Sequence, residues 1–474
     1  MAEPPIVVWF RNDLRLEDHP ALASAAARAP VVALFVLDDL SPGPWRLGGA
    51  ARWWLAGSLR SLSAQLAARG LKLLLRKGAA EDVVSDVARA SGATAVYCSR
   101  AYEPWAREQE ARTKARLDAL GISLKRFPGA LLVEPEALTT KTGGPYRVFT
   151  PFWRALSAGD VRRPIPAPKR LGAAELDLTG VTLEECALLP HMPDWAGGLR
   201  NTWSPGTDAA RRHLDAFITA RLGDYAEQRN RPDLPATSRL SPFLRHGEIS
   251  PAACWHAAQA RAEPESAGRE TFLKEIVWRE FSYHLLFHFP SMPEIPLRSE
   301  FAAFPWAHDP VGLSRWQQGR TGYPIVDAGM RQLWATGWMH NRVRMIVASF
   351  LIKHLFIPWQ TGAAWFWDTL VDADLASNSA SWQWVAGCGA DAAPYFRIFN
   401  PVKQGETFDP AGDYVRTWVP ELARLPSPAI HAPWEAPPAE LAAAGVRLGT
   451  DYPLPIVDHR EARNRALAAF QQLR

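Results

Sequence analysis

Three side chains in the stretch Val371–Trp384 have the types and the spacing that suit ligand chemistry. Asp374, Asn378 and Trp382 are four residues apart, so on a helix they share one face. A helix face packed in a core is normally aliphatic. We predict a helix or helical turns here. The residues allow two interpretations: a polar edge and an aromatic ring that bind a planar heterocycle, or a capping Asp, a surface Asn and a half-buried Trp.

Hydroxyl groups gather at the start of a short predicted helix further upstream. Thr237, Ser238 and Ser241 lead into a Ser-Pro pair, and a second Ser-Pro pair stands at 250–251. Serine is a preferred N-cap and proline is favoured at the first helical position, so we expect Ser241 and Ser250 to cap two helices. Hydroxyls and free backbone N–H groups at a helix start suit a phosphate. A capped turn without a ligand explains the same residues.

The next predicted helix, Thr271–Phe289, combines an acid, an aromatic ring and a base on one face. Glu275, Trp278, Arg279 and Ser282 follow the i, i+3, i+4, i+7 spacing of neighbours on a helix surface. Such a face can line a cavity. The simpler alternative is a surface Glu–Arg pair beside a packed tryptophan.

A further helical segment places Asn341, Arg344 and Met345 on one face. We expect Arg344 to pair with Asp372 or Asp374. A buried pair of this kind is tolerated only when its other donors and acceptors are hydrogen-bonded.

Short apolar runs alternate with helical patterns in the first 130 residues. The predicted strands are Ile6–Phe10, Val31–Leu37, Leu71–Leu75, Ala93–Cys98 and Ile122–Phe127. The predicted helices are Pro20–Ala29, Gly49–Arg69, Ala79–Ser91 and Pro104–Leu120. This alternation predicts an α/β domain with a parallel five-stranded, doubly wound sheet. Because the chain has no GxGxxG motif or P-loop, we expect no standard dinucleotide or nucleoside-triphosphate site on it.

Later parts of the chain differ in pattern. Prolines interrupt the periodicity between 131 and 205, where we expect a connecting linker with one short helix at Thr150–Ser157. From Thr207–Arg221 onward the patterns are helical. The predicted domains are therefore an α/β domain at 1–130, the linker at 131–205 and an all-α domain at 206–474.

Length and composition limit the class of protein. At 474 residues the chain exceeds what one core normally supports, so we expect two or three domains. Its 21 tryptophans suggest work beyond packing, such as stacking on flat ligands or carrying electrons. The net charge of +4 is compatible with a polyanionic partner.

The cysteines and the N-terminal residues bear on the compartment. Four widely spaced cysteines form no CxxC pair, so we expect no zinc site and no disulfide, but reduced thiols. The first residues, MAEPPIVVWF, lack the basic and apolar segments of a secretory signal. No apolar run is long enough to span a bilayer. We expect no metal, no membrane association and a cytoplasmic location.

Six stretches, in order along nearly the whole chain, resemble the photolyase/cryptochrome flavoproteins. They are WFRNDLRLEDHPAL (9–22), TSRLSPFLRHGEIS (237–250), FLKEIVWREF (272–281), GYPIVDAGMRQLWATGWMHNRVRM (322–345), DADLASNSASWQW (372–384) and DAAPYFRIFNP (391–401). Any one of them alone is weak, but six in the same order are highly specific. The resemblance implies an N-terminal α/β domain, a connecting loop and an all-α C-terminal domain that binds FAD.

The resemblance also assigns roles to single residues. The residues implied to hold FAD are Tyr225, Thr237, Ser238, Arg239, Leu240 and Ser241 at its phosphates and sugar, Arg344, Asp372 and Asp374 beside the isoalloxazine and its linker, and Asn378 at flavin N5. Trp306, Trp359 and Trp382 are implied to carry electrons from the surface to the flavin.

A second set of residues is implied to contact damaged DNA. The implied lesion cavity contains Glu275, Trp278, Arg279, Asn341, Met345 and Trp384, with Glu275, Asn341 and Asn378 as the catalytic candidates. The candidates for binding DNA phosphates are Arg229, Arg342, Arg397 and Lys403.

The subtype follows from which side chains can exchange protons. Related enzymes that repair the (6-4) photoproduct use two histidines, and the corresponding positions here resemble Asn341 and Met345, neither of which titrates. Plant cryptochromes have an Asp at flavin N5 that can donate a proton, whereas Asn378 cannot. We therefore expect repair of cyclobutane pyrimidine dimers, driven by light through electron transfer from excited reduced FAD.

Three alternatives stay open. They are a cryptochrome-like blue-light photoreceptor without repair activity, a DASH-type enzyme restricted to loop or single-stranded DNA, and an electron-transfer flavoprotein with no nucleic-acid partner. On the N-terminal sheet we expect an antenna chromophore, methenyltetrahydrofolate in preference to 8-hydroxy-deazaflavin. We expect a monomer that acts on dimer-containing DNA in a bacterial cytoplasm and is associated with the nucleoid when bound.

Overall fold

The computed structural model describes residues 3–174, 178–261, 266–391 and 396–473. The packing of the chain divides it into two units. The first unit comprises Met1–Gly223, Ser238–Pro290 and Val371–Ala376, and the second comprises Asp224–Thr237, Ser291–Leu370 and Ser377–Arg474. The domains expected from the sequence, at 1–130, 131–205 and 206–474, are continuous stretches of chain. They stay a prediction.

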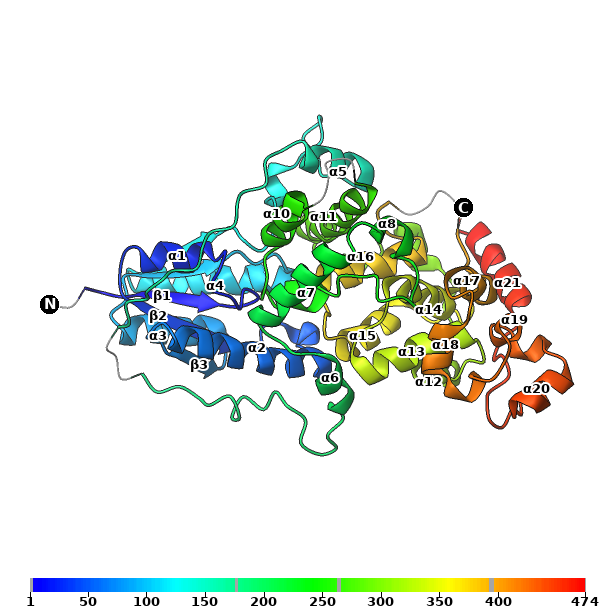
Figure 1. Cartoon of the computed structure of the whole chain (residues 1–474). Coiled ribbons are helices and arrows are strands. Elements are labelled where there is room, and N and C mark those ends of the chain that lie inside the picture. Colours follow the sequence, from blue (N-terminus) through cyan, green and yellow to red (C-terminus); the bar gives the residue numbers. More distant parts are fainter. Residues whose placement is uncertain (1–2, 175–177, 262–265, 392–395, 474) are drawn as a thin grey trace. The chain divides into compact units, whose positions relative to one another are not determined.

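The first unit is built on a five-stranded sheet whose strands all run parallel (Figure 1). The strands are β1 (Ile6–Phe10), β2 (Val31–Leu37), β3 (Leu73–Lys77), β4 (Ala95–Ser99) and β5 (Ser123–Phe127). Their order is β3-β2-β1-β4-β5, so the chain winds outward from β1 in both directions. The parallel five-stranded sheet predicted from the sequence is confirmed.

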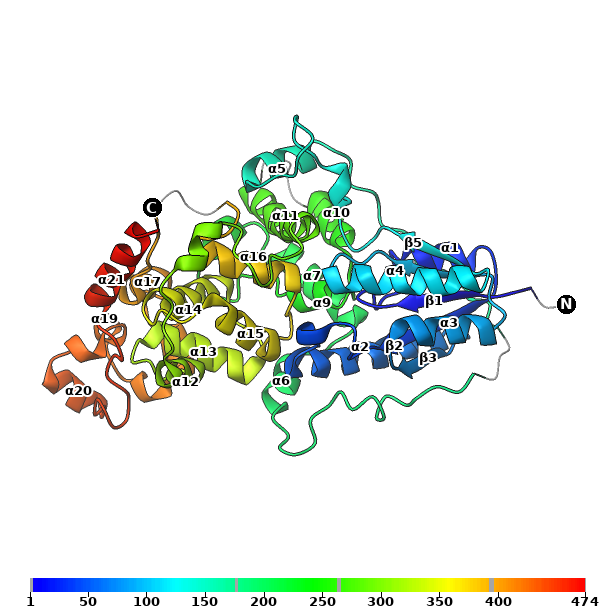
Figure 2. The same ribbon diagram turned by 180° about the vertical axis from the view of Figure 1, so that it is seen from behind.

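Four helices cover the two faces of this sheet, as seen from both sides in Figures 1 and 2. They are α1 (Pro20–Ala26), α2 (Gly49–Ala67), α3 (Ala80–Ala90) and α4 (Pro104–Ala119). Val8 and Phe10 of β1 pack with α1 and α2, whereas Val7 and Trp9 pack with α3 and α4. Alternate residues of one strand face opposite sides of a sheet, so both faces are buried, and the doubly wound architecture is confirmed.

The segment between the sheet and the later helices is largely irregular in its described residues (Figure 1). It contains α5 (Phe149–Ser157), close to the predicted short helix, and α6 (Gly197–Thr202). The sequence did not indicate α6 because two glycines and three polar residues in six positions give no apolar periodicity.

The first unit also holds the helices that position its candidate site residues. They are α7 (Thr207–Ala220), α9 (Ser241–Arg245), α10 (Pro251–Arg261) and α11 (Ala267–His288), with short 3-10 turns η1 (Gly43–Trp45) and η2 (Pro135–Ala137). The Ser250 hydroxyl accepts a hydrogen bond from the Ala253 N–H at 3.0 Å, so the predicted cap of α10 is confirmed. α11 begins four residues earlier than predicted, because the Ser266 hydroxyl caps it.

The second unit is helical, as predicted. Its helices are α8 (Tyr225–Gln228), α12 (Pro310–Gln317), α13 (Pro324–Thr336), α14 (Asn341–Lys353), α15 (Trp359–Thr369), α16 (Leu375–Ala386), α17 (Pro401–Phe408), α18 (Asp413–Trp418), α19 (Ser427–Ile430), α20 (Pro438–Ala444) and α21 (His459–Gln471), with 3-10 turns η3 (Ser299–Ala303), η4 (Pro420–Leu422) and η5 (Pro433–Glu435). The first two residues of α16 belong to the first unit. Within the described ranges, no helix combines the length and apolarity that crossing a bilayer requires.

Gly247 ties the end of α9 to the loop after β1, within the first unit. Its φ is +68°, and a Cβ there would lie 2.1 Å from the Asn12 carbonyl oxygen. We expect Gly247→Ala to destabilise the protein by about 3 kcal/mol or more, because backbone strain of this kind costs about 1–3 kcal/mol before the clash is added. Urea denaturation checks this value.

Gly92→Ala is the matched control. Gly92 has a similar φ of +64°, but an added Cβ would meet nothing within 4 Å. This variant isolates the cost of the left-handed backbone, about 1–2 kcal/mol. Equal losses in the two variants would contradict the close approach at Asn12.

Candidate flavin and nucleic-acid sites

In the first unit, the loop before α9 is joined to the segment that carries two buried carboxylates. The Ser241 hydroxyl donates a hydrogen bond to Asp372 Oδ2 at 2.6 Å. The expectation that Ser241 caps α9 is wrong. Leu240 occupies the cap position without a side-chain bond, and Ser241 is the first helical residue. The hydroxyl is used for a bond across 131 positions of the chain instead of a local cap.

The end of α9 holds the backbone between the two carboxylates. Arg245 Nε donates a hydrogen bond to the Ala373 carbonyl, and His246 Nε2 lies 3.2 Å from the Val371 carbonyl oxygen. Arg245 is buried, and its Nη1 has no hydrogen-bond partner. An unsatisfied buried guanidinium nitrogen is costly, and an anionic oxygen would satisfy it.

Burial of His246 makes the stability of the first unit sensitive to acid. Burial, then the nearby Arg245 charge, lowers the pKa of His246 to about 3. Below pH 6.5 the unfolded chain binds this proton while the folded chain does not, so the free energy of unfolding falls by about 1.4 kcal/mol per pH unit. We expect His246→Gln to reduce the slope of stability against pH between 5 and 6 by about one proton.

Denaturant midpoints at several pH values measure this slope. The control is His191→Gln, because His191 is exposed and its replacement leaves folded packing unchanged. A slope that is the same in both variants would show that His246 takes up its proton in the folded state.

The second buried carboxylate of this segment, Asp374, accepts a hydrogen bond from the Tyr283 hydroxyl on α11. Asp374 immediately precedes α16. The prediction of a helical element across the whole of Val371–Trp384 is therefore wrong at its start. Asp372 and Asp374 are each 7% exposed, so both carboxylates are largely shielded from bulk solvent.

On the face of α11 that the sequence singled out, Trp278 and Arg279 both contact other parts of the protein. Trp278 stacks on Phe149, with centroids 3.7 Å apart and planes at 4°, so one face of its indole is covered by protein. Arg279 donates to the Ala130 carbonyl at 3.0 Å and contacts Glu280 at 3.2 Å, and its side chain is 14% exposed. Arg279 is therefore not part of a solvated surface pair. Glu275 is half-buried on the same helix.

In the second unit, α16 places Asn378 and Trp382 one turn apart. Asn378 Nδ2 donates to the Ala363 carbonyl at 3.0 Å, which fixes the amide and leaves its oxygen as an acceptor. A Cβ on Gly362 would lie 2.2 Å from the Trp382 ring, so glycine allows α15 to approach this indole. Trp382 also packs edge-on to Phe366, with centroids 5.0 Å apart.

The three tryptophans predicted to carry electrons all lie in the second unit. Trp382 and Trp359 are both 2% exposed, on α16 and at the start of α15. Trp306 is half-buried and packs against Phe304 at 4.5 Å. A series from buried to partly exposed indoles has the burial that the prediction requires. Its electron-carrying role stays a prediction.

Helix α14 carries three further predicted residues. Asn341 is exposed at its start, and Arg344 and Met345 are half-buried. Arg344 Nε donates to the Met339 carbonyl at 2.8 Å. Its pairing with Asp372 or Asp374 stays a prediction.

Three of the four predicted phosphate-binding cations are close enough to affect one another. Burial lowers the pKa of Arg342, and the charges of Arg229 and Arg397 lower it further. Arg342 Nη2 donates to Asn230 Oδ1 at 2.9 Å. Lys403 differs, because its ammonium pairs with Glu406 at 2.7 Å. The charges of Arg229, Arg342 and Arg397 therefore act on one another within the second unit.

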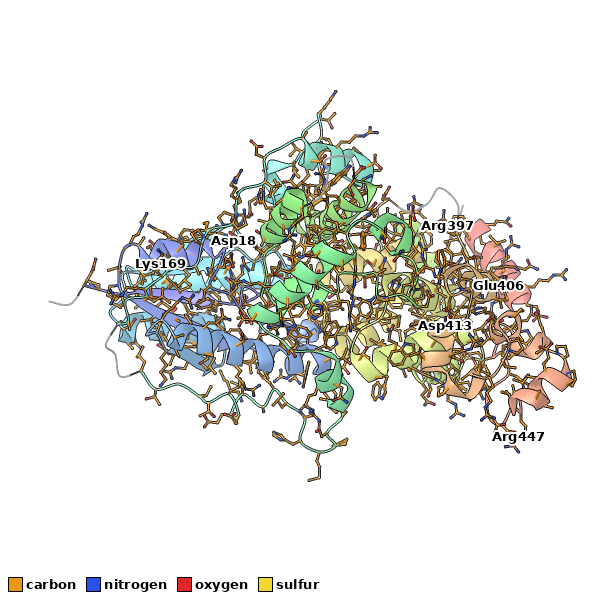
Figure 3. All side chains as sticks on the ribbon, in the orientation of Figure 1. Asp18, Lys169, Arg397, Glu406, Asp413 and Arg447 are labelled. Carbon is orange, nitrogen blue, oxygen red and sulfur yellow. The ribbon has the colours of Figure 1, made fainter. Side chains whose placement is uncertain are left out.

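A recess in the second unit brings Trp384 and Arg397 together. Besides these two, its lining consists of Arg298, Ser349, Lys353, Val385, Gly387, Phe396, Phe399 and Phe470. Lys353 is 3% exposed, and burial, followed by the Arg397 charge, lowers the pKa of its ammonium to about 7. Figure 3 shows Arg397 at the surface. Among the described residues, the lining is cationic and aromatic and contains no carboxylate.

Sequence reasoning missed Arg245, Tyr283 and Lys353. Lys353 had a visible signal, since it interrupts the apolar run ASFLIKHLF. Arg245 and Tyr283 had none, because only their distant partners, Ala373 and Asp374, give them their significance.

Known proteins resemble this chain along its whole length. Residues 6–169 match the family described as DNA photolyase, and residues 272–472 match the FAD binding domain of DNA photolyase. The chain is 52% identical to a deoxyribodipyrimidine photo-lyase of Agrobacterium fabrum, over 98% of this chain and 97% of that protein. It is 41% identical to Cryptochrome-1 of Arabidopsis thaliana, over 98% of this chain and 70% of that protein.

A solved structure resembles it equally closely. The bacterial class III photolyase from Agrobacterium tumefaciens superposes with a TM-score of 0.96 at 51% identity, covering 100% of this chain and 98% of that one. The chain therefore belongs to the photolyase/cryptochrome family. The resemblance stated from its six sequence stretches is confirmed, although residues 392–395 of the last stretch lie outside the described part of the structure.

Proposed function

We propose that this protein is a deoxyribodipyrimidine photo-lyase that uses blue light and FAD to split cyclobutane pyrimidine dimers in DNA. The observation that carries this proposal is the cationic, aromatic recess around Trp384 and Arg397. Stacking and phosphate neutralisation are the two interactions that hold an extruded nucleotide. A photoreceptor without a DNA substrate has no use for this combination.

The residues present fit FAD. Its diphosphate suits the unsatisfied Arg245 Nη1, and its hydroxyl and imide donors suit the buried carboxylates Asp372 and Asp374. The residues proposed to hold it are those implied by the resemblance, namely Tyr225, Thr237, Ser238, Arg239, Leu240, Ser241, Arg344, Asp372, Asp374 and Asn378. When bound and reduced, FAD supplies a photoexcitable electron donor.

The protein's own groups then have distinct tasks. Asn378, fixed by Ala363, offers an amide oxygen that neither gains nor loses a proton. Glu275, half-buried on α11, is proposed to hydrogen-bond the carbonyls of the dimer. Trp384 and Trp278 are proposed to stack on its two bases, for about 1–3 kcal/mol per base.

The remaining members of the lesion site are Arg279, Asn341 and Met345. Met345 and Asn341 present no titratable group, which favours dimers over (6-4) photoproducts. Photolyases extrude their target from the duplex, and extrusion costs least for a damaged pair. A pyrimidine dimer already distorts the base stack, so it costs less to extrude than an intact pair. This lower cost contributes to its selection.

The test of this function compares substrates. With the reduced holoprotein in blue light, we expect repair of a dimer both in duplex and in single-stranded DNA. Repair of single-stranded DNA alone would favour the DASH-type alternative. Absence of salt-dependent DNA binding would favour an electron-transfer flavoprotein.

Arg397 gives a further test of the DNA interface. We expect Arg397→Ala to weaken DNA binding for all sequences and to reduce the slope of log K against log salt by about 1. Lys403→Ala should have a smaller effect, because Glu406 already neutralises Lys403. Fluorescence anisotropy at several salt concentrations measures both slopes.

Arg447→Ala serves as the control for Arg397. The Arg447 side chain is 75% exposed and pairs with Asp451. Figure 3 labels Arg447 at the surface. An unchanged slope in Arg397→Ala, equal to that of this control, would remove Arg397 from the DNA interface.

The remaining assignments follow from this function. We propose an antenna chromophore on the N-terminal sheet, methenyltetrahydrofolate in preference to 8-hydroxy-deazaflavin, because the stretch at 387–401 resembles the bacterial class related to plant cryptochromes. We also propose a monomer that acts in a bacterial cytoplasm and joins the nucleoid when bound to DNA.

A further inference from the structure

A buried tyrosine in the first unit has the surroundings of a redox-active phenol. Tyr283 is 5% exposed and donates its hydroxyl hydrogen to Asp374. The guanidinium of Arg279 lies over its ring, 4.7 Å from the centroid. The phenol of Tyr283 therefore has a carboxylate base, Asp374, at its oxygen and a cation, Arg279, over its ring.

A second tyrosine beside it repeats this arrangement. Tyr102 is 2% exposed and lies 2.9 and 3.0 Å from the two carboxylate oxygens of Glu134. The guanidinium of Arg100 lies 5.6 Å from its ring centroid. The rings of Tyr102 and Tyr283 meet edge to face, with centroids 5.8 Å apart.

These surroundings determine how each phenol can lose an electron. A cation near the ring face opposes a positive charge on the ring, because it is attracted by the neutral ring's electron density. The phenol can therefore release an electron only if its proton leaves as well. Asp374 and Glu134 each accept a hydrogen bond from the phenol oxygen and are positioned to take that proton.

The groups that follow the two tyrosines are increasingly exposed to solvent. Glu134 pairs with Arg100 at 2.6 Å, and their side chains are 24% and 23% exposed. Arg100 also pairs at 2.6 Å with Glu136, whose side chain is 48% exposed. The buried pair of tyrosines thus ends at polar groups that meet water.

We propose that Tyr283 and Tyr102 form a second route that supplies electrons to oxidised flavin, separate from the tryptophan series in the other unit. This inference rests on the proposed function, because it requires FAD beside Asp374. Tyr283 would give up one electron to a light-excited oxidised flavin held beside Asp374, and its phenolic proton would pass to Asp374.

The cycle closes with an external thiol. Tyr102 gives one electron to Tyr283, which recovers its proton from Asp374, and the Tyr102 proton passes to Glu134. A thiolate in solution then reduces Tyr102, which recovers its proton from Glu134, and two thiyl radicals combine to a disulfide. The sum is one electron moved from each thiolate to the flavin, with both tyrosines restored.

The experiment uses the full-length holoprotein carrying Trp306→Phe, so that the tryptophan series is interrupted. Light-driven reduction of FAD by dithiothreitol is followed by absorbance, and radicals are trapped by freezing under light for electron paramagnetic resonance. We expect a residual reduction rate and a tyrosyl signal. Adding Tyr102→Phe should lower the residual rate about tenfold, a change of about 1.4 kcal/mol in barrier.

Tyr97→Phe is the matched control, since Tyr97 is also 2% exposed and lies on β4. It should leave the rate and the signal unchanged. Tyr102 does not touch Asp374, so its loss spares the flavin site, whereas Tyr283→Phe should remove the signal altogether.

Two results would overturn the relay: no residual reduction in Trp306→Phe, or equal rates in the Tyr102→Phe and Tyr97→Phe derivatives. Repair of dimers by chemically reduced enzyme is measured beside them. Loss of repair with an intact tyrosyl signal would count against the proposed function and leave the relay standing.

Discussion

Replacing Trp306 by phenylalanine is expected to slow light-driven reduction of FAD by at least about tenfold, equivalent to about 1.4 kcal/mol in barrier. Trp306 is the half-buried member of the predicted series, and Trp359 and Trp382 are buried. Phenylalanine keeps the apolar packing against Phe304 but is much harder to oxidise than an indole. Absorbance of the flavin under blue light with a thiol measures the rate.

The same variant should repair dimers normally once its FAD is reduced chemically, because the tryptophans restore the reduced cofactor and take no part in splitting the lesion. Trp334→Phe is the control, since Trp334 is 65% exposed in the same unit and outside the predicted series. If Trp306→Phe lost photoreduction and repair together, the assignment of Trp306 to electron supply would fail.

Replacing Glu275 by alanine is expected to lower the yield of repair per absorbed photon about tenfold while FAD stays bound. A half-buried carboxyl at the lesion is proposed to hydrogen-bond the dimer carbonyls, where negative charge gathers after electron transfer. Groups oriented toward developing charge contribute more in a water-poor site than in solution. Actinometry of dimer repair measures the yield.

Two variants separate this role from packing. Glu275→Gln keeps the size and a hydrogen-bond donor, so we expect it to retain most of the yield. Glu270→Ala removes an exposed glutamate of the same helix, which pairs with Lys274, and should change nothing. A full yield in Glu275→Ala would remove Glu275 from the mechanism.

The fold was largely predictable because periodicity is a local property. β1 and β2 occupy their predicted ranges, since continuous apolar runs of buried parallel strands are unambiguous between turns. β3 lies two residues later than predicted, at Leu73–Lys77. Arg76 and Lys77 look like loop residues, yet they pair with Val36 and Leu37 at the sheet edge, and this partner is not visible in the local sequence.

The site could be predicted only where its residues belong to a recognisable local sequence pattern. Ser241 matched the pattern of an N-cap, but its hydroxyl binds Asp372 instead. Tyr283 follows Arg279 by one turn of α11, and Arg245 lies in the 237–250 stretch, but the sequence implied no role for either. Both take their roles from the 371–376 segment, more than 90 positions away, and tertiary partners at such separations cannot be deduced from spacing.

The most direct test of the central claim is repair of one defined lesion. A DNA duplex carrying a single thymine cyclobutane dimer is incubated with the chemically reduced holoprotein, in blue light and in the dark, and the intact thymines are counted by chromatography. The account predicts restoration of thymines in light alone. Bound DNA and fully reduced FAD without restored thymines would contradict it, and would favour a photoreceptor.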